Sequence, residues 1–359
     1  MLWTEKYAPR RFDEIFGQEA LRCIGDYASS GNIPNLIFHG PSGAGKRSTA
    51  LVLASALYGD SWEDNFVYIN ASDFFEGGKT YLAGEQRFRH ILRSYVARQA
   101  QKNGRGKLQP PKEVEPRNIK GSVIEIFKHI LNHYAALRPT NAPFKIIVID
   151  SSEELRSDAQ HALRRIIERY NSTCRFIFST VQLTKLILPI RSRCFCLYFR
   201  SLDDDAVKKI INRIADGEKI RISDGAMDAI ICSARGNAGN AINILQASAC
   251  VSSTVDEDSV SRATDAFHTE QIDRLLEGVS HKKIWECRET LDSLLTERGI
   301  SGRGVAEMLC DAILSGLEIP ENVKASAVLA VGDADFRLLS GLNERVHMEK
   351  LLLELMDIF

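Results

Sequence analysis

The segment GPSGAGKRST at residues 40–49 has the composition of a phosphate-binding loop. Its glycines would let successive backbone N–H groups point at phosphate oxygens, and a helix starting there would add the positive end of its dipole. Lys46 would then contact the β- and γ-phosphates of a nucleoside triphosphate. A glycine turn without a ligand is the alternative, but a lysine at this position has little packing purpose. We therefore expect ATP or ADP to bind at four residues of the loop: Gly40, Gly43, Gly45 and Lys46.

The position after the lysine departs from the usual loop. A serine or threonine hydroxyl there normally binds Mg²⁺, whereas this chain has the cation Arg47, followed by Ser48 and Thr49. Arg47 and Ser48 are still candidates for contact with the nucleotide. We expect Mg²⁺, however, to bind poorly at this chain's own site.

The partner motif for the metal is an apolar strand that ends in an aspartate. Residues 144–150, FKIIVID, provide such a strand and end in Asp150. The acid that would polarise the attacking water is missing, because Ser151 stands in its place. Glu153 and Glu154 are expected on the next turn and need not reach the site. The sequence therefore predicts a pocket that holds nucleotide and hydrolyses it poorly, although Asp150 could instead cap a following helix.

Strand and helix patterns alternate through the first 200 residues. Short runs of apolar, β-branched or aromatic residues occur at 35–40, 66–70, 144–150, 174–180 and 194–199. Their near-continuous apolarity is typical of a parallel sheet covered on both faces, and amphipathic helices such as 157–170 lie between them. The pattern predicts an α/β domain.

Other segments are expected to be helices or a loop. The helical pattern of 85–102 places four apolar residues on one side: Phe88, Ile91, Leu92 and Tyr95. The Gly-, Pro- and charge-rich segment 102–118 predicts a surface loop. After residue 200 we expect the strands to stop, with three amphipathic helices in 201–262 and further helices in 263–359.

The composition is that of a globular protein. Charged residues make up 26% and hydrophobic residues 44% of the 359 residues, and the formal net charge is −1, so the bulk charge does not indicate a nucleic-acid partner. The eight cysteines include no CxxC pair, so no metal site is predicted. The charged N-terminal segment lacks a signal-peptide core, and no apolar run approaches the roughly 20 residues of a membrane span. We therefore expect a cytoplasmic protein without a membrane partner.

Several segments together resemble the small subunits of replication factor C, the clamp loader, and the C-terminal end looks most like archaeal ones. They are DAQHALRRIIERYNSTCRFIF at 158–178, LPIRSRC at 188–194, WTEKYAPRRFDEIFGQE at 3–19, NASD at 70–73 and GDADFRLLSGLNERVHMEKLL at 332–352. The resemblance covers nearly the whole chain except residues 77–122, which we interpret as an insertion.

The resemblance implies an AAA+ fold with an α/β nucleotide-binding domain at 1–200, a helical lid at 201–262 and an all-helical collar at 263–359. In the family, the collar joins five subunits, ATP binding lets the assembly open a sliding clamp, and primer-template DNA triggers hydrolysis and release. The implied partners are other replication factor C subunits in a heteropentamer, a PCNA-like sliding clamp and primer-template DNA. The implied location is the archaeal nucleoid, or the nucleus if the source is eukaryotic.

The resemblance also implies roles for single residues. Tyr7 and Pro9, in EKYAP, would flank the nucleotide base, while Lys46 and Asp150 would keep their roles. Arg193, in the Ser-Arg-Cys motif, would enter the ATP site of the neighbouring subunit as an arginine finger. Such a residue can raise the rate of hydrolysis by about 10³ to 10⁵.

The chain departs from the family at four positions of its own catalytic pocket: Arg47, Ser151, Val181 and Gly239. The arginine that serves another subunit's pocket, Arg193, is intact. We hypothesise that the chain is a non-catalytic or weakly catalytic subunit that donates this arginine. An active motor ATPase, rescued by Ser48 and Glu153, and a nucleotide-free scaffold held through its collar are the two other functions that the sequence leaves open.

Contacts with DNA are expected from basic residues that follow the template phosphates. Lys128 takes the place of a DNA-tracking arginine, and Arg164 and Arg165 belong to an ALRR segment that the family uses near its subunit interface and its DNA-facing core. A solvated helix face is the alternative for Lys128.

Overall fold

The computed structural model describes residues 1–102, 116, 119–250, 254–263, 266–297, 300–315, 319–341 and 343–359. Two compact units make up the chain. The first unit comprises Met1–Arg221 with Ile230–Gln246, and the second comprises Ile222–Ala229 with Ala247–Phe359. The division into three domains at 1–200, 201–262 and 263–359 stays a prediction.

The first unit is built around a five-stranded parallel sheet in the order β2-β3-β4-β1-β5. Its strands are β1 Leu36–His39, β2 Phe66–Asn70, β3 Lys145–Asp150, β4 Cys174–Thr180 and β5 Phe195–Tyr198. Each strand lies in a segment whose apolar residues predicted one. The expected α/β architecture is therefore confirmed.

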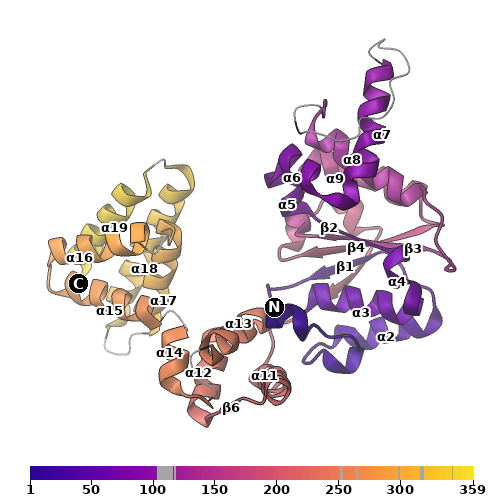
Figure 1. The fold of residues 1–359 in the computed structure, drawn as a ribbon. Coiled ribbons are helices and arrows are strands. Elements are labelled where there is room, and N and C mark those ends of the chain that lie inside the picture. Colours follow the sequence, from indigo (N-terminus) through magenta and orange to yellow (C-terminus); the bar gives the residue numbers. More distant parts are fainter. Residues whose placement is uncertain are drawn as a thin grey trace. The chain divides into compact units, whose positions relative to one another are not determined.

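Apolar residues on both faces of the sheet explain why helices cover it twice. Along β3, Ile146 and Val148 belong to one buried cluster, whereas Ile147 and Ile149 belong to another, since successive side chains of a strand point to opposite faces. Helices α2 (Ala20–Ser30) and α3 (Lys46–Tyr58) pack on one face, and α7 (Gln86–Lys102), α8 (Val123–Ala136) and α9 (Ser157–Arg169) pack on the other (Figure 1).

The helices within and beside the predicted insertion belong to the same core. The four residues expected on one side of α7 are buried, with exposures of 0% to 6%: Phe88, Ile91, Leu92 and Tyr95. Helix α8 begins at Ser122, whose hydroxyl accepts from the Glu125 N–H while the Glu125 carboxylate accepts from the Ser122 N–H, and this capping box fixes the start of the helix. Most of the loop predicted at 102–118 lies outside the described residues.

Short helices complete the surroundings of the sheet. They are α1 Trp3–Lys6, η1 Phe12–Glu14, η2 Gly59–Ser61, α4 Trp62–Asn65, α5 Ala71–Glu76, α6 Gly78–Gly84, η4 Ser152–Glu154, η5 Leu183–Lys185 and α10 Leu188–Arg191. Three longer helices follow the sheet along the chain: α11 Asp204–Glu218, α12 Asp224–Ala234 and α13 Ala238–Ala249. These three correspond to the amphipathic helices predicted for 201–262.

The second unit is mainly helical, as expected. Its further helices are α14 Glu257–Ala263, α15 Ala266–Ser280, α16 Ile284–Asp292, the π-helix η6 Ser293–Glu297, α17 Gly302–Ser315, α18 Glu321–Ser340 and α19 Glu344–Ile358. Fully buried leucines from four of them, including Leu275, Leu291, Leu309 and Leu352, form one core. The prediction that strands end near residue 200 was wrong in detail, because β6 Arg221–Ile222 and β7 Thr254–Val255 form a two-stranded sheet.

Among the described helices, none combines the length and the apolarity needed to cross a bilayer.

Candidate functional site

A pocket of about 370 Å³ lies in the first unit at the carboxyl ends of β1, β3 and β4. Ligands commonly bind at this edge of a parallel sheet. Eight of the residues predicted to contact nucleotide line it: Tyr7, Pro9, Gly43, Gly45, Lys46, Arg47, Ser48 and Asp150. The four positions interpreted from the sequence as departures from the family line it as well: Arg47, Ser151, Val181 and Gly239. The structure thus brings the predicted nucleotide residues and the departures into one cavity.

The loop before α3 needs its glycines for two separate reasons. Gly43 and Gly45 have φ values of 72° and 89°, a left-handed conformation that costs other L-residues energy. A Cβ atom at Gly43 would also overlap the amide oxygen of Asn237, and one at Gly40 would overlap the carbonyl oxygen of Phe199. Gly40 does not line the pocket itself. It lies so close to the Phe199 main chain that a side chain would not fit at the start of the loop.

Lys46 is folded over the loop to which it belongs. Its Nζ donates to the carbonyl oxygens of Gly40 and Pro41, each at 2.7 Å, and the residue is 8% exposed. Burial lowers the pKa of the Lys46 ammonium, while the charges of Asp150 and Glu153 oppose this shift. An anionic ligand at this position would favour the protonated form.

Arg47, Tyr68 and Asp150 form a chain of contacts along the pocket wall. The Arg47 guanidinium lies 4.6 Å from the centre of the Tyr68 ring, and the Tyr68 hydroxyl donates to Asp150 Oδ2 at 2.5 Å. The Ser151 N–H donates to the other carboxylate oxygen at 3.0 Å. Burial and the neighbouring carboxylate raise the pKa of Tyr68, so its hydroxyl stays protonated as a donor. The sequence reasoning missed Tyr68, and Asp150 does not take the alternative role of a helix N-cap.

The hydroxyl groups near the loop have different positions. The Thr49 hydroxyl is buried and donates back to the Gly45 carbonyl oxygen at 2.9 Å, so it is not directed at a ligand. Ser48 lines the pocket. Among the described residues of the pocket, the position of the usual hydroxyl ligand is taken by the cationic Arg47, and both Asp150 oxygens accept hydrogen bonds, an arrangement unlike the near-octahedral oxygen ligands that Mg²⁺ requires. The residues present therefore do not fit the metal that the fold family implies.

Glu153 lies in the pocket wall. The short helix η4 brings it there, and one carboxylate oxygen accepts from the Val181 N–H at 3.3 Å. The sequence left open whether this acid reaches the site; Ser151 takes a left-handed conformation, with φ 49°, just before η4. Glu154 is not among the lining residues.

A third basic residue of the pocket, Arg213, was also missed. It lies on α11, lines the cavity and forms an ion pair with Glu14 at 3.0 Å. Although burial works to raise the pKa of Glu14, hydrogen bonds from the Arg10 backbone and the charge of Arg213 lower it. The only signal in the sequence was an arginine on the face of an amphipathic helix, which is typical of many solvated helices.

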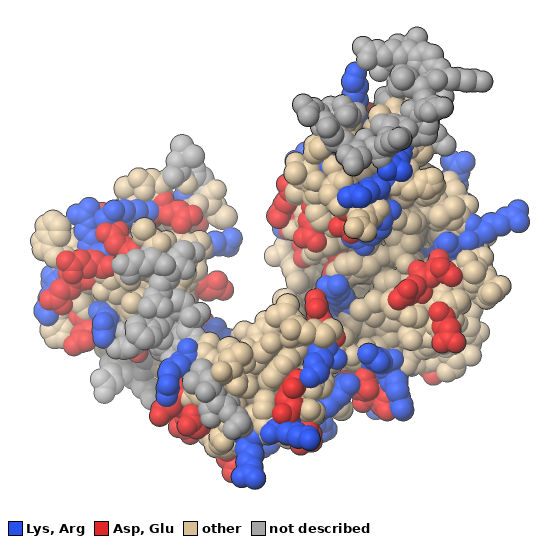
Figure 2. All heavy atoms as spheres, viewed as in Figure 1, with Lys and Arg blue, Asp and Glu red and all other residues tan. Residues whose placement is uncertain are grey.

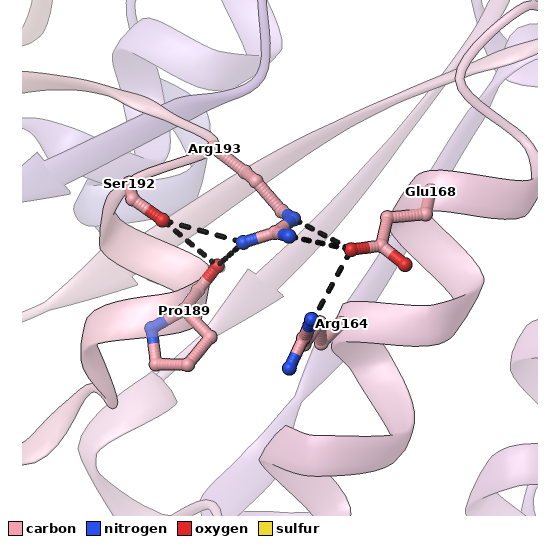
Figure 3. Close-up of polar contacts among 5 residues, drawn as sticks. All are labelled: Arg164, Glu168, Pro189, Ser192 and Arg193. Atoms are coloured by element: carbon pink, nitrogen blue, oxygen red, sulfur yellow. Dashed lines mark hydrogen bonds and ion pairs between the residues drawn. The ribbon is translucent and has the colours of Figure 1, made fainter.

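Arg193 lies outside this pocket, in the segment between α10 and β5 (Figure 3). Its guanidinium contacts a single oxygen of Glu168 on α9, with Nε at 2.9 Å and a terminal nitrogen at 2.6 Å, and also donates to the Pro189 carbonyl oxygen at 2.8 Å. Arg164 reaches the same carboxylate oxygen at 3.4 Å. Burial works to raise the pKa of Glu168, but the bonds from Arg193 and Arg164 lower it below its usual value.

The three residues predicted to contact DNA fall into two places. Lys128 and Arg165 line one groove together with Asn132, Asp158, His161, Ala162, Ile166 and Arg169. Arg164 points instead to Glu168, beside Arg193 (Figure 3). The face of the molecule drawn in Figure 2 carries both signs of charge, which agrees with the net charge of −1.

Comparisons with known proteins give the family. Residues 267–354 match the model of the replication factor C C-terminal domain, and residues 19–203 match that of the DNA polymerase III delta subunit. The chain is 33% identical to the replication factor C small subunit of Archaeoglobus fulgidus, over 98% of this chain and 96% of the relative. The corresponding protein of Methanocella arvoryzae is 34% identical, over 98% and 95%. This chain belongs to the replication factor C small-subunit family.

A solved structure agrees with the AAA+ fold. A mutant of RuvB from Thermotoga maritima has a TM-score of 0.50 and 15% identity, covering 89% of this chain and 92% of that one. At this identity the likeness concerns the fold alone. Membership of the replication factor C family identifies the chain as a clamp-loader small subunit, as the resemblance implied.

Proposed function

We propose that this replication factor C small subunit binds ATP or ADP in its own pocket, hydrolyses it poorly, and supplies Arg193 to the ATP site of a neighbouring subunit. The assembly would be a heteropentamer that opens a PCNA-like clamp and loads it onto primer-template DNA, in the nucleoid or the nucleus. The predicted lid at 201–262 and collar at 263–359 would respectively close over the nucleotide and join the subunits.

One contrast carries this proposal. All four departures from the family lie in the wall of a single pocket, whereas Arg193 lies outside that pocket and keeps its motif. The loop glycines and Lys46 are still shaped for phosphate, so binding is expected to survive. Hydrolysis is expected to suffer because neither a metal-binding hydroxyl after Lys46 nor an acid after Asp150 is present.

The surroundings of Arg193 support a role in trans. The Arg193 and Glu168 side chains are 32% and 46% exposed, and ion pairs between such exposed groups contribute little net stability. A terminal phosphate of a neighbour's nucleotide can therefore compete with Glu168 for the guanidinium, whose planar donors suit phosphate oxygens. Until a neighbour docks, Glu168 would keep Arg193 close to its own chain.

Reconstitution with the active subunits tests this division of labour. We expect Arg193→Ala to lower the DNA- and clamp-stimulated ATPase strongly, since an arginine finger is worth about 10³ to 10⁵ in rate at its site. Lys46→Ala should have a small effect, because the chain's own pocket contributes little turnover. The exposed Arg22→Ala, on α2, is a matched loss of one arginine and should leave the ATPase unchanged. Equal or reversed effects of the two test variants would refute the donor role.

Nucleotide titration of the isolated chain separates the two other functions. Tight binding without turnover supports the proposal. Brisk turnover would favour the active motor, for which the position of Glu153 in the pocket wall is the specific observation. The absence of binding would favour the nucleotide-free scaffold.

The groove that contains Lys128 and Arg165 is the proposed contact with the template backbone. Arg169 adds a third basic group to the same groove, and such groups bind phosphates without regard to sequence. Arg164, which shares Glu168 with Arg193, is better placed to link this region to the arginine finger than to bind DNA directly.

A further inference from the structure

The residues that would bind Mg²⁺ in a phosphate-binding loop make contacts with other side chains of the pocket here. At the position where the family has a hydroxyl ligand, this chain has Arg47. Its guanidinium carbon lies 4.6 Å from the centre of the Tyr68 ring. The carboxylate of Asp150 accepts from the Tyr68 hydroxyl through one oxygen, at 2.5 Å, and from the Ser151 N–H through the other, at 3.0 Å. Each carboxylate oxygen of Asp150 therefore already accepts one hydrogen bond, and a metal there would share these oxygens with Tyr68 and Ser151.

The positive charge of Arg47 also disfavours binding of a divalent cation. Arg47 and Lys46 both line the pocket at the start of α3, together with the carboxylates of Asp150 and Glu153, so Arg47 adds one positive charge to the lysine that a phosphate-binding loop ordinarily has. A nucleotide polyphosphate, in contrast, would be attracted by both, and by the backbone N–H groups of the loop. Unlike the compact ammonium group of a lysine, the planar guanidinium of an arginine can donate to two phosphate oxygens in parallel.

We propose that this pocket binds the polyphosphate of ADP or ATP without Mg²⁺, with the Arg47 guanidinium in the place of the metal ion. Tyr68 has two functions in this arrangement: its ring packs against the Arg47 guanidinium, and its hydroxyl donates a hydrogen bond to Asp150. The proposal rests on the proposed function, because it assumes that the pocket binds nucleotide. It also agrees with poor hydrolysis, since the Mg²⁺ that normally bridges the β- and γ-phosphate oxygens and neutralises the developing charge would be missing.

Calorimetric titration of the full chain with ADP, in Mg²⁺ and in EDTA, tests the proposal without any variant. We expect the two dissociation constants to agree within about twofold, whereas a metal-dependent site would lose at least tenfold in EDTA, the equivalent of one unit in log Kd. A tenfold loss for the wild-type chain would overturn the proposal and leave the proposed function intact. No heat of binding in either buffer would overturn both.

Variants test the residues themselves. Arg47→Ser removes the guanidinium and restores a hydroxyl, so we expect its affinity for ADP in EDTA to fall at least about tenfold. The double variant Arg47→Ser with Tyr68→Phe also frees Asp150 and should bind ADP at least about tenfold more tightly in Mg²⁺ than in EDTA. Arg47 is exposed, so the fold should tolerate its loss, which circular dichroism can check. An Arg47→Ser chain that binds ADP in EDTA as the wild type does would overturn the proposal.

Discussion

At the scale of single residues, Gly43 is constrained both by its backbone conformation and by its surroundings. Its φ of 72° is left-handed, and a Cβ there would overlap the Asn237 amide oxygen. We expect Gly43→Ala to displace the loop and raise the Kd for ADP at least about tenfold, measured by calorimetry on the purified chain.

Gly31 provides the matched control for this prediction. It ends α2 with a φ of 64°, and a Cβ there would meet no atom within 4 Å. Gly31→Ala should therefore carry a similar backbone penalty of roughly 1 to 2 kcal/mol in stability and leave the Kd unchanged. If both variants bound ADP as the wild type does, the loop would not form the nucleotide site.

The residues of the pocket differ in how far the sequence could predict them. The glycines, Lys46 and Asp150 stand in short motifs with fixed spacing, so local sequence was enough to place them. Tyr68 could not be found in this way, because its contact with Asp150 depends on the pairing of β2 with β3, which places Asn70 opposite Asp150. That register follows from tertiary packing.

At the scale of elements, the strands were predictable because each is an almost continuous apolar run between polar segments. The order of the strands was not, since nothing within a strand indicates its neighbour. The same holds for Glu153, whose direction depends on the left-handed conformation of Ser151. A serine in that conformation is uncommon, and no local pattern signals it.

The contact between α9 and the segment after α10 should depend on pH. Because the native pKa of Glu168 lies below its usual value of 4.5, the ionised carboxylate stabilises the fold at higher pH. This contribution is lost as the pH falls through the native pKa. We expect the wild-type chain to melt at a slightly higher temperature than Glu168→Gln near pH 7, and the difference to shrink as the pH falls below 4.5. Thermal unfolding followed by circular dichroism measures both.

Glu19→Gln serves as the control for Glu168. Glu19 is 83% exposed and lies 3.8 Å from Arg200, so its removal should not change the melting temperature at any pH. A difference between wild type and Glu168→Gln that persists unchanged in acid would contradict the ionic origin of the contact.

At the scale of the whole molecule, α18 carries an exposed apolar stripe. Leu329, Phe336 and Leu339 are 74%, 73% and 65% exposed, and their spacing places them on one face of the helix. Burying such side chains contributes about 1.5 to 3 kcal/mol each. We expect Leu329→Ser with Phe336→Ser to lower association with the partner subunits at least about tenfold, measured by co-purification of the assembly.

The double substitution Leu329→Ser with Phe336→Ser should affect only the assembly of the subunits. The exposed Asn322→Ser on the same helix should assemble as the wild type does, and ADP binding in the other unit should be unaffected by either change. Normal assembly of the double variant would show that this face is not an interface between subunits.

The parallel pairing of β1 with β5 places Arg193 and the phosphate loop at opposite ends of these two strands. The two strands are parallel, with Leu36 opposite Phe195 and His39 opposite Tyr198. Arg193 precedes the amino end of this pair, whereas the phosphate loop follows its carboxyl end, about 13 Å away along strands of four residues. A neighbour that receives the arginine and a neighbour that approaches the pocket must therefore meet different surfaces. Contacts of this kind are heterologous, so they cannot close a two-fold dimer, and they lead to a ring or an open arc.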